Sequence, residues 1–239
     1  DADDYTLVGE VTIPAGTSST TTTLTSETDT LDEEDEETVI ITLSCETGSN
    51  CSAGTPVEET VKIVDDDLPP TVTLLVDPME VMEDSGLPVS VTAQLSTPSQ
   101  KEIKVMLVIL GSATSTEDYT LVDSITIPAG SASSTVSLVV ISDKLNEDDE
   151  TVIISFGDST NATTTSPQTK TFTIKNDDLP PTVSLSVNPD IIKEKGTSTL
   201  SVITLTLSEF SGFDVKVTLT ATGTAQEVFD YELSSKDVV

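Results

Sequence analysis

The sequence feature that most constrains the fold is a six-residue segment that occurs twice. Asp66-Asp67-Leu68-Pro69-Pro70-Thr71 recurs, 111 residues later, as Asp177-Asp178-Leu179-Pro180-Pro181-Thr182. Each copy follows one run of β-forming residues and opens another. Because proline fixes φ and biases the preceding residue towards an extended conformation, a Pro-Pro pair acts as a short, semi-rigid spacer. The repeat therefore predicts two junctions between units of ordinary domain size.

These junctions divide the chain into one whole repeat and two partial ones. Residues 69–179 form the complete repeat, and residues 1–68 match only its second half: Ile13-Pro14-Ala15-Gly16, for example, matches Ile127-Pro128-Ala129-Gly130. Residues 180–239 match only its first half. The two partial repeats are complementary, because together they contain every strand of a whole unit. We expect the end of one copy to complete a sandwich with the start of the next, within a longer chain or between subunits.

Alternation of apolar and polar residues predicts β-strands throughout the complete repeat. Val89, Val91 and Ala93 alternate with polar residues, which is the period of a strand with one buried face. Turn sequences separate the runs, among them Gly157-Asp158-Ser159, and no segment has a helical period. This pattern favours an all-β antiparallel sandwich over the alternative of a small closed barrel. The expected strands are 71–76, 89–95, 103–110, 124–127, 134–141, 151–156 and 172–174.

The charge of the chain limits its partners. With 42 acidic and 10 basic residues its net charge is −32, which repels nucleic acid and anionic membranes and attracts cations. Histidine and tryptophan are absent, so the chain offers few general bases and few stacking platforms. No apolar run is long enough to insert into a membrane, and no targeting segment is recognisable. Since the sequence begins at Asp1 without a methionine, we expect it to be a segment of a longer protein.

Carboxylates recur at the same few places in each repeat. They precede a glycine-containing turn, precede a tyrosine, form a run before a Val/Ile strand, and end the repeat at the Pro-Pro junction. Strand ends that are far apart in sequence meet at one pole of a sandwich, so we expect these four places to converge. The alternative is that the acids form a solvated surface that keeps the protein soluble.

A convergent carboxylate cluster requires a counter-ion. Two like charges ~4 Å apart repel by about 4 kcal/mol at an effective dielectric constant near 20. Ca²⁺ accepts six to eight oxygen ligands in flexible geometry, whereas Mg²⁺ demands a tight octahedron. The sequence therefore predicts Ca²⁺, with two neighbouring ions suiting this number of ligands better than one.

Five motifs follow one another in the complete repeat. They are Glu83-Asp84-Ser85-Gly86, Asp118-Tyr119, Ile127-Pro128-Ala129-Gly130, Asp143 to Glu150, and Ile174-Lys175-Asn176-Asp177-Asp178. In this order they resemble the Calx-beta domain, a module of sodium-calcium exchangers and of many cell-surface repeat proteins. The resemblance covers nearly the whole chain, and implies tandem immunoglobulin-like sandwiches of about seven strands that bind Ca²⁺ at the pole next to the following domain. Ser142 and Asn176 stand where the exchanger pattern has acids, which implies fewer or weaker ions.

The resemblance implies a set of metal ligands for each repeat. In the complete repeat they are Glu83, Asp118, Asp143, the Leu145 carbonyl, Glu147, Glu150, Asp177 and Asp178. In the first partial repeat they are Asp4, Asp29, Glu33, Glu36, Asp65, Asp66 and Asp67. In the last they are Glu194 and Asp230.

Cysteines and possible glycan acceptors bear on where the protein works. Cys45 and Cys51 are separated by a turn-like stretch and are interpreted as a disulfide, with two free thiols as the alternative. Asn161-Ala162-Thr163 and Asn50-Cys51-Ser52 fit the pattern for N-linked glycans.

Three functions follow from these features. The first is a non-enzymatic, extracellular or cell-surface array with a structural or adhesive role, which Ca²⁺ makes rigid and which assembles head to tail into a filament or forms part of a long rod. The second is an intracellular calcium-sensing module of a membrane transporter. The third, a carboxylate-based hydrolase, is the least favoured, because repeated acidic sites on both sides of a junction are not what one substrate cleft requires.

Overall fold

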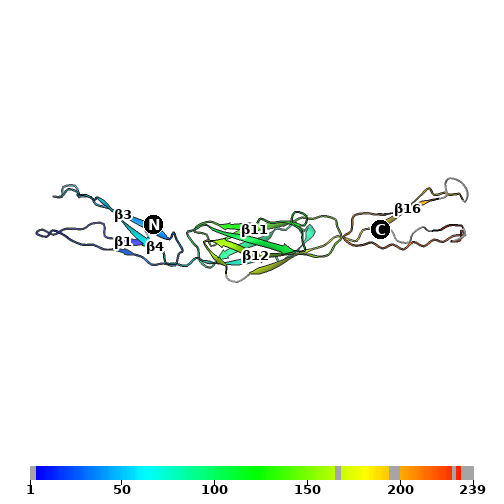
Figure 1. Cartoon of the computed structure of the whole chain (residues 1–239), viewed down its shortest axis with the longest axis horizontal. Helices are drawn as coiled ribbons and strands as arrows, with labels where there is room; N and C mark the ends of the chain where they lie inside the picture. Colours follow the sequence, from blue (N-terminus) through cyan, green and yellow to red (C-terminus); the bar gives the residue numbers. More distant parts are fainter. Residues whose placement is uncertain (1–3, 165–167, 194–199, 228–229, 233–239) are drawn as a thin grey trace.

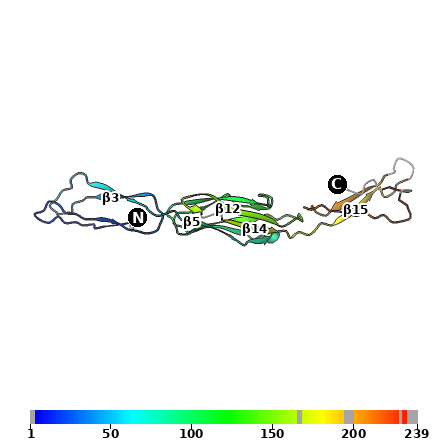
Figure 2. The ribbon, with the colours of Figure 1, turned by 60° about the horizontal axis from the view of Figure 1, so that its bottom comes forward.

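The computed structural model describes residues 4–164, 168–193, 200–227 and 230–232. Strands form nearly all of the regular structure, and one short 3₁₀ turn, η1 (Glu83–Ser85), is the helical element of the described residues. Three parts lie in a row along the long axis of the molecule, with the most extensive sheets in the middle (Figures 1 and 2). The strands are β1 (Tyr5–Leu7), β2 (Leu24–Ser26), β3 (Glu36–Thr42), β4 (Glu58–Val64), β5 (Thr71–Asp77), β6 (Glu80–Met82), β7 (Val89–Leu95), β8 (Ile103–Gly111), β9 (Tyr119–Thr120), β10 (Ser124–Ile127), β11 (Ser133–Val140), β12 (Glu150–Thr160), β13 (Thr163–Thr164), β14 (Thr169–Lys175), β15 (Val183–Asn188) and β16 (Val202–Leu207).

Two five-stranded sheets form the central part, which we call the central sandwich. One sheet has the order β10-β8-β12-β14-β6 and the other the order β13-β5-β7-β11-β9. Pairing is antiparallel except at two edges, where the short strands β6 and β13 run parallel to β14 and β5. The prediction of an all-β sandwich is confirmed. The sequence pattern does not predict the short strands β6, β9 and β13.

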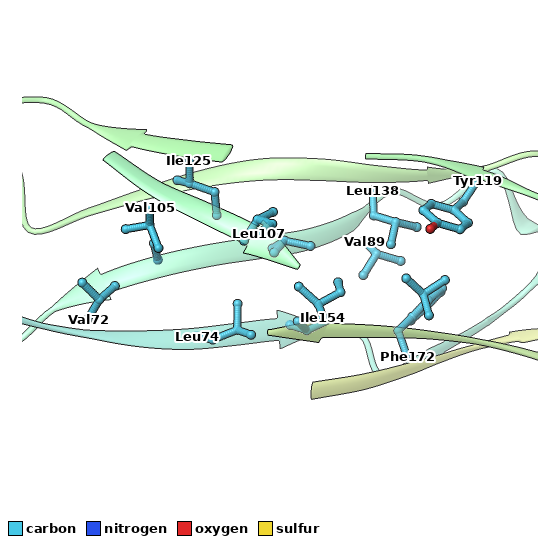
Figure 3. Packing of buried hydrophobic residues seen from close by; sticks show 14 of the residues in the cluster. Val72, Leu74, Val89, Val105, Leu107, Tyr119, Ile125, Leu138, Ile154 and Phe172 are labelled. Carbon is cyan, nitrogen blue, oxygen red and sulfur yellow. The ribbon is translucent and has the colours of Figure 1, made fainter. Parts of the chain in front are cut away.

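Alternate side chains of both sheets meet in one hydrophobic core. In β5, Val72 and Leu74 are fully buried whereas Thr73 between them is exposed. Ile154 and Phe172 belong to the same cluster from the other sheet, and Figure 3 shows buried side chains of both sheets between the two layers. Burying one side chain of this size contributes about 1.5–3 kcal/mol, so this cluster is the main source of stability for the central sandwich.

The predicted turn at Gly157-Asp158-Ser159 is wrong. These residues lie inside β12, where pairing with β8 shifts register between Phe156 and Ser159. Glycine inside a strand marks either a turn or a bulge, and here it marks a bulge. A Cβ atom at position 157 would lie only 3.2 Å from Val108 Cγ2. Glycine, which has no Cβ, therefore lets β12 pass close to β8 at this point.

The parts on either side of the central sandwich carry two-stranded sheets. The first segment, residues 4–68, contains the pairs β1-β2 and β3-β4, and the last segment, from residue 180, contains the pair β15-β16. In the first segment, Cys45 and Cys51 form a disulfide. None of the described helical structure is long and apolar enough to cross a membrane.

Candidate metal site

The predicted ligands of the complete repeat come from four separate elements of the central sandwich. Glu83 opens η1, Asp118 directly precedes β9, and Asp178 follows β14. The acidic run from Asp143 lies between β11 and β12 and ends at Glu150, the first residue of β12. We call this end of the sandwich the acidic pole, and the chain leaves it towards residue 180 (Figure 1).

The first group of carboxylates at the acidic pole consists of Glu83, Asp143 and Asp178. One oxygen from each lies within 4.8 Å of the others. Glu83 is 6% exposed, and its Oε1 accepts a hydrogen bond of 2.6 Å from the Asp143 N–H. Asp143 Oδ1 in turn accepts a bond of 2.6 Å from the Leu145 N–H, which holds the loop in a tight turn. The backbone therefore fixes two of the three carboxylates before any ion is bound.

The second group consists of Asp118, Glu147 and Glu150, again with one oxygen each within 4.8 Å of the others. The Thr114 N–H donates to Asp118 Oδ2 at 2.5 Å, which orients that carboxylate. Glu150 Oε2 is buried and has no hydrogen-bond partner. A buried carboxylate oxygen without a donor is costly, so its position requires a cation or a proton.

Burial and mutual repulsion favour the protonated forms of these acids. Burial is the first cause that raises the pKa of Glu150 to about 7, and a hydrogen bond shared between the Glu150 and Asp118 carboxyl groups is the second. Burial also raises the pKa of Glu83 and Glu147, reinforced for both by Asp143 and Asp178, and a hydrogen bond from the Asp143 backbone opposes the rise at Glu83. Groups with such shifted pKa values cluster at functional sites.

Solved structures that resemble this chain come from Calx. The crystal structures of CBD12 from CALX1.2 and of the calcium binding domain CBD12 of CALX1.1 share 21% and 22% identity with it, each with a TM-score of 0.38, covering 44% of this chain and 45% of theirs. The apo-form Calx CBD1 domain shares 22% identity with a TM-score of 0.37, covering 45% of this chain and 98% of its own. These neighbours are Calx calcium-binding domains.

This chain spans less than half the length of the two CBD12 structures. No protein-family model and no curated protein matches it. The assignment of the metal site therefore rests on the carboxylates of this chain.

Two predicted ligands of the complete repeat, Asp177 and the Leu145 carbonyl, are not members of the two groups of carboxylates. Asp177 is exposed and belongs to neither group, although Asp178 beside it does. Leu145 lies within the acidic loop, where its N–H orients Asp143. Asn176, which replaces an acid of the family pattern, accepts a bond of 3.4 Å from the Asp178 N–H through Oδ1.

The first segment repeats this arrangement with one difference. Asp4, Glu33 and Glu37 form a third group with oxygens within 4.8 Å of one another, and Asp4 is 9% exposed. The sequence predicts Glu36 as a ligand instead of Glu37, whereas in the structure Glu36 bonds to Lys62 Nζ at 2.5 Å. The pairing Glu37↔Ile63 corresponds to Glu150↔Ile174 in the central sandwich. Counting back from the matched strand would have identified Glu37.

The other predicted ligands of the first segment occupy positions like their counterparts. Asp29 Oδ1 accepts from the Leu31 N–H at 2.7 Å, as Asp143 does from Leu145. Asp65 accepts from the N–H groups of Glu33 and Asp67, both at 3.2 Å, and Asp66 is exposed.

In the last segment, Asp230 Oδ2 accepts from the Gln226 N–H at 2.8 Å, as Asp118 accepts from Thr114. Glu194 lies outside the described residues.

We expect the stability of the calcium-free protein to fall as pH rises from 5 to 8. Glu150 binds its proton more tightly in the folded state (pKa about 7) than in the unfolded state (pKa near 4.5), so the folded protein holds more protons in this window. The free energy of unfolding therefore decreases as pH rises through the folded pKa. The hydrogen bond from Lys175 is the main cause that lowers the pKa of Asp149. Asp149 is therefore ionised in both the folded and the unfolded state between pH 5 and 8, and it does not offset the pH dependence that Glu150 causes. Thermal melting in EDTA at pH 5 and pH 8 measures this, and equal midpoints would contradict it.

Proposed function

We propose that the chain binds Ca²⁺ at the acidic pole of the central sandwich, and that it acts by binding rather than by catalysis. The observation that supports this proposal most strongly is the environment of Glu150, a member of one of the two groups of three converging carboxylates. Its Oε2 atom is buried and has no hydrogen-bond partner. Oxygen-only donors suit a hard cation, and no histidine is available to favour zinc. Glu83, Asp143 and Asp178 would hold one ion, and Asp118, Glu147 and Glu150 a second. The ions supply the positive charge that these clustered carboxylates otherwise lack.

Calcium is expected to raise the melting temperature of the chain. Ligand that binds the folded but not the unfolded state adds RT ln(1 + [L]/Kd) to stability, about 2.7 kcal/mol at a hundredfold excess over Kd. Melting in EDTA and then in millimolar Ca²⁺ tests this, with Mg²⁺ as the matched control ion. An unchanged midpoint, together with no bound metal by elemental analysis, would overturn the proposal.

Two settings suit such a module. The Calx resemblance favours an intracellular calcium-sensing part of a membrane transporter. The disulfide between Cys45 and Cys51 instead favours an oxidising, extracellular or cell-surface setting. Asn50 and Asn161 would carry glycans only in the second setting, and Asn161 is exposed, with its Nδ2 donating to the Glu102 carbonyl at 2.9 Å. Mass spectrometry of protein from its natural host distinguishes the two settings. A mass that glycosidase lowers, together with oxidised cysteines, supports the extracellular setting. An unmodified mass with free thiols supports the intracellular one.

We also propose that the two outer segments complete each other. Residues 180–239 of one copy and residues 1–68 of another copy would form one sandwich around a shared core, with the same architecture as residues 69–179. The pairing Leu185↔Leu205 in the last segment repeats Leu74↔Ala93 of the central sandwich. Leu74 is fully buried, but Leu185 is 59% exposed. Among the described residues of the last segment, no strands corresponding to β12 and β14, which lie in the sheet opposite β5 and β7 in the central sandwich, are present.

The first segment contains those missing strands. The pairing Val39↔Val61 in β3-β4 repeats Val152↔Phe172 in β12-β14. Phe172 is fully buried, whereas Val61 is 37% exposed. A second copy thus offers the strands that would cover the last segment, and this head-to-tail contact does not close on itself, so it propagates as a filament.

The complementation proposal predicts that the full chain forms linear assemblies. Leu185→Asp should abolish them because it places a charge in the new core, and Ser186→Asp, on the opposite face of the same strand, is the matched control. Light scattering and electron microscopy are the readouts. Folded monomers of the unsubstituted chain would contradict the proposal, as would assemblies that Leu185→Asp leaves intact.

A further inference from the structure

Part of the outer edge of β5 is covered by a glutamine side chain instead of a strand. Gln168 Nε2 donates to the Val72 carbonyl at 2.9 Å, and Gln168 Oε1 accepts from the Leu74 N–H at 2.8 Å. One side-chain amide thus bonds to a carbonyl and an N–H of the same strand, as the peptide groups of a neighbouring strand would. We call this contact the amide cap.

The two capped groups lie on the side of β5 that faces away from its sheet. The Thr71 carbonyl accepts from the Ser96 N–H at 2.9 Å, so the odd-numbered residues of β5 bond to β7. Because bonded and non-bonded pairs alternate along an antiparallel ladder, the backbone groups of the even-numbered residues point away from β7. The Val72 carbonyl and the Leu74 N–H therefore lie where a further strand would add.

The amide cap continues the cover that β13 begins. Among the described residues, β13 pairs with Thr71 and Val72, and the Thr163 N–H donates to the Pro70 carbonyl at 2.9 Å. The cap starts at the Val72 carbonyl, where this pairing ends. Its glutamine directly precedes β14, which belongs to the other sheet. The cap therefore reaches the β5 edge from across the sandwich.

The strand behind the cap has the composition of a segment that pairs with copies of itself. Residues 71–76 are Thr-Val-Thr-Leu-Leu-Val and contain no charged residue, proline or glycine. Six-residue segments of this kind stack with identical segments of other chains when their edge is exposed. The net charge of −32 opposes contact between copies, but this segment carries none of that charge. The occupant that best fits an open β5 edge is therefore β5 of a second copy.

The partial repeats lack both the cap and the apolar strand. β15, which matches β5, has Ser186 in place of Leu75. Counted along the matched strands β4 and β14, Val57 of the first segment stands at the position of Gln168. A valine side chain has no group that bonds to a strand edge. The glutamine is thus not a constant feature of the repeat, and it accompanies the more apolar strand.

We propose that Gln168 blocks edge-to-edge pairing of β5 with β5 of a second copy of this chain. It does so by occupying the Val72 carbonyl and the Leu74 N–H, the groups that such pairing requires. The inference depends neither on Ca²⁺ nor on the completion of the outer segments, which involves β3, β4, β15 and β16.

Spin labels at Thr73, an exposed residue of β5, test the proposal on the full chain. A spin-labelled unnatural amino acid leaves the disulfide intact. Paired strands lie about 4.7–4.9 Å apart, so pairing of two β5 edges brings the labels of two copies close together and broadens their spectrum. We expect a sharp spectrum for the otherwise unsubstituted chain and a broadened one for Gln168→Leu, which dilution with unlabelled chain sharpens again. The Leu74 amide, without its acceptor, should exchange its hydrogen about fivefold faster in Gln168→Leu.

Three controls separate edge protection from other effects. Gln168→Glu loses the bond to the Val72 carbonyl but places a charge at the edge, which opposes strand pairing, so its spectrum should stay sharp. Gln94→Leu makes the same substitution at an exposed position of β7, and a label at Ser137 reports on an exposed position of β11 in the same sheet. Both should also give sharp spectra, the second in the Gln168→Leu background. A sharp Thr73 spectrum for Gln168→Leu overturns the proposal, as does a broadened one for the unsubstituted chain. Equal broadening in Gln168→Glu, in Gln94→Leu or at Ser137 overturns it too, because the association would then come from lost stability, from added apolar surface or from another face.

Discussion

Glu150→Gln is expected to weaken Ca²⁺ binding by about a hundredfold. Substituting the partners that merely orient metal ligands typically costs 10- to 100-fold in affinity, so removing the charge of a ligand should reach at least the upper end of that range. Glu150 lies at the start of β12 with one buried, unpartnered oxygen, and glutamine preserves the size of the side chain while removing its charge. The substitution also relieves repulsion from Asp118, so the calcium-free protein should become slightly more stable at pH 8. Calorimetric titration and melting in EDTA measure the two effects.

Asp149→Asn is the matched control for Glu150→Gln. Asp149 is the adjacent residue, and its substitution removes the same charge. Its carboxylate bonds to Lys175 Nζ at 2.7 Å in an exposed ion pair and belongs to neither carboxylate group. Exposed ion pairs contribute about 0–1 kcal/mol, so this substitution should change affinity little. Equal losses of affinity in the two variants would show that the general acidity of the pole, rather than the geometry of Glu150, attracts the ion.

Phe172→Ala should destabilise the central sandwich by about 3–5 kcal/mol, the usual cost of emptying a buried phenylalanine position. Phe172 is fully buried among residues of both sheets (Figure 3). Thr171→Ala, on the next residue of β14, is the control, because Thr171 is exposed. Chemical denaturation in saturating Ca²⁺ measures the difference. A loss below 1 kcal/mol for Phe172→Ala would contradict the description of the core.

The period-two pattern and the repeated Pro-Pro segment were sufficient to predict the sandwich. The long strands of the central sandwich bury one face, so Val72 and Leu74 of β5 alternate with polar or exposed neighbours as the pattern requires. The pattern fails at Gly157, because sequence alone does not distinguish a glycine that ends a strand from one that bulges within it. It also misses β6 and β13, which are held at the sheet edges by parallel partners rather than by their own alternation.

The candidate site was predicted in outline, since the same acids recur at the same points of the repeat. The sequence pattern selects Glu36 when it is counted forward through the acidic run, because the first segment has one additional residue there. Counting back from Thr38, which matches Thr151, selects Glu37, and the structure places a Glu37 oxygen close to oxygens of Asp4 and Glu33. The ion pair between Lys101 Nζ and Asp32 Oδ1, at 3.1 Å, has no local signal in the sequence. It depends on how the first segment meets the central sandwich, and the residues concerned are separated by the whole of β3 to β7.

A crystal structure of the chain grown in Ca²⁺, with anomalous scattering to identify the ion, tests directly whether Ca²⁺ lies between the carboxylates of the acidic pole. The proposal predicts ions 2.3–2.6 Å from oxygens of Glu83, Asp143 and Asp178, and from those of Asp118, Glu147 and Glu150. A pole without ions at saturating Ca²⁺, with Glu150 Oε2 satisfied by a proton or a protein donor, would contradict it.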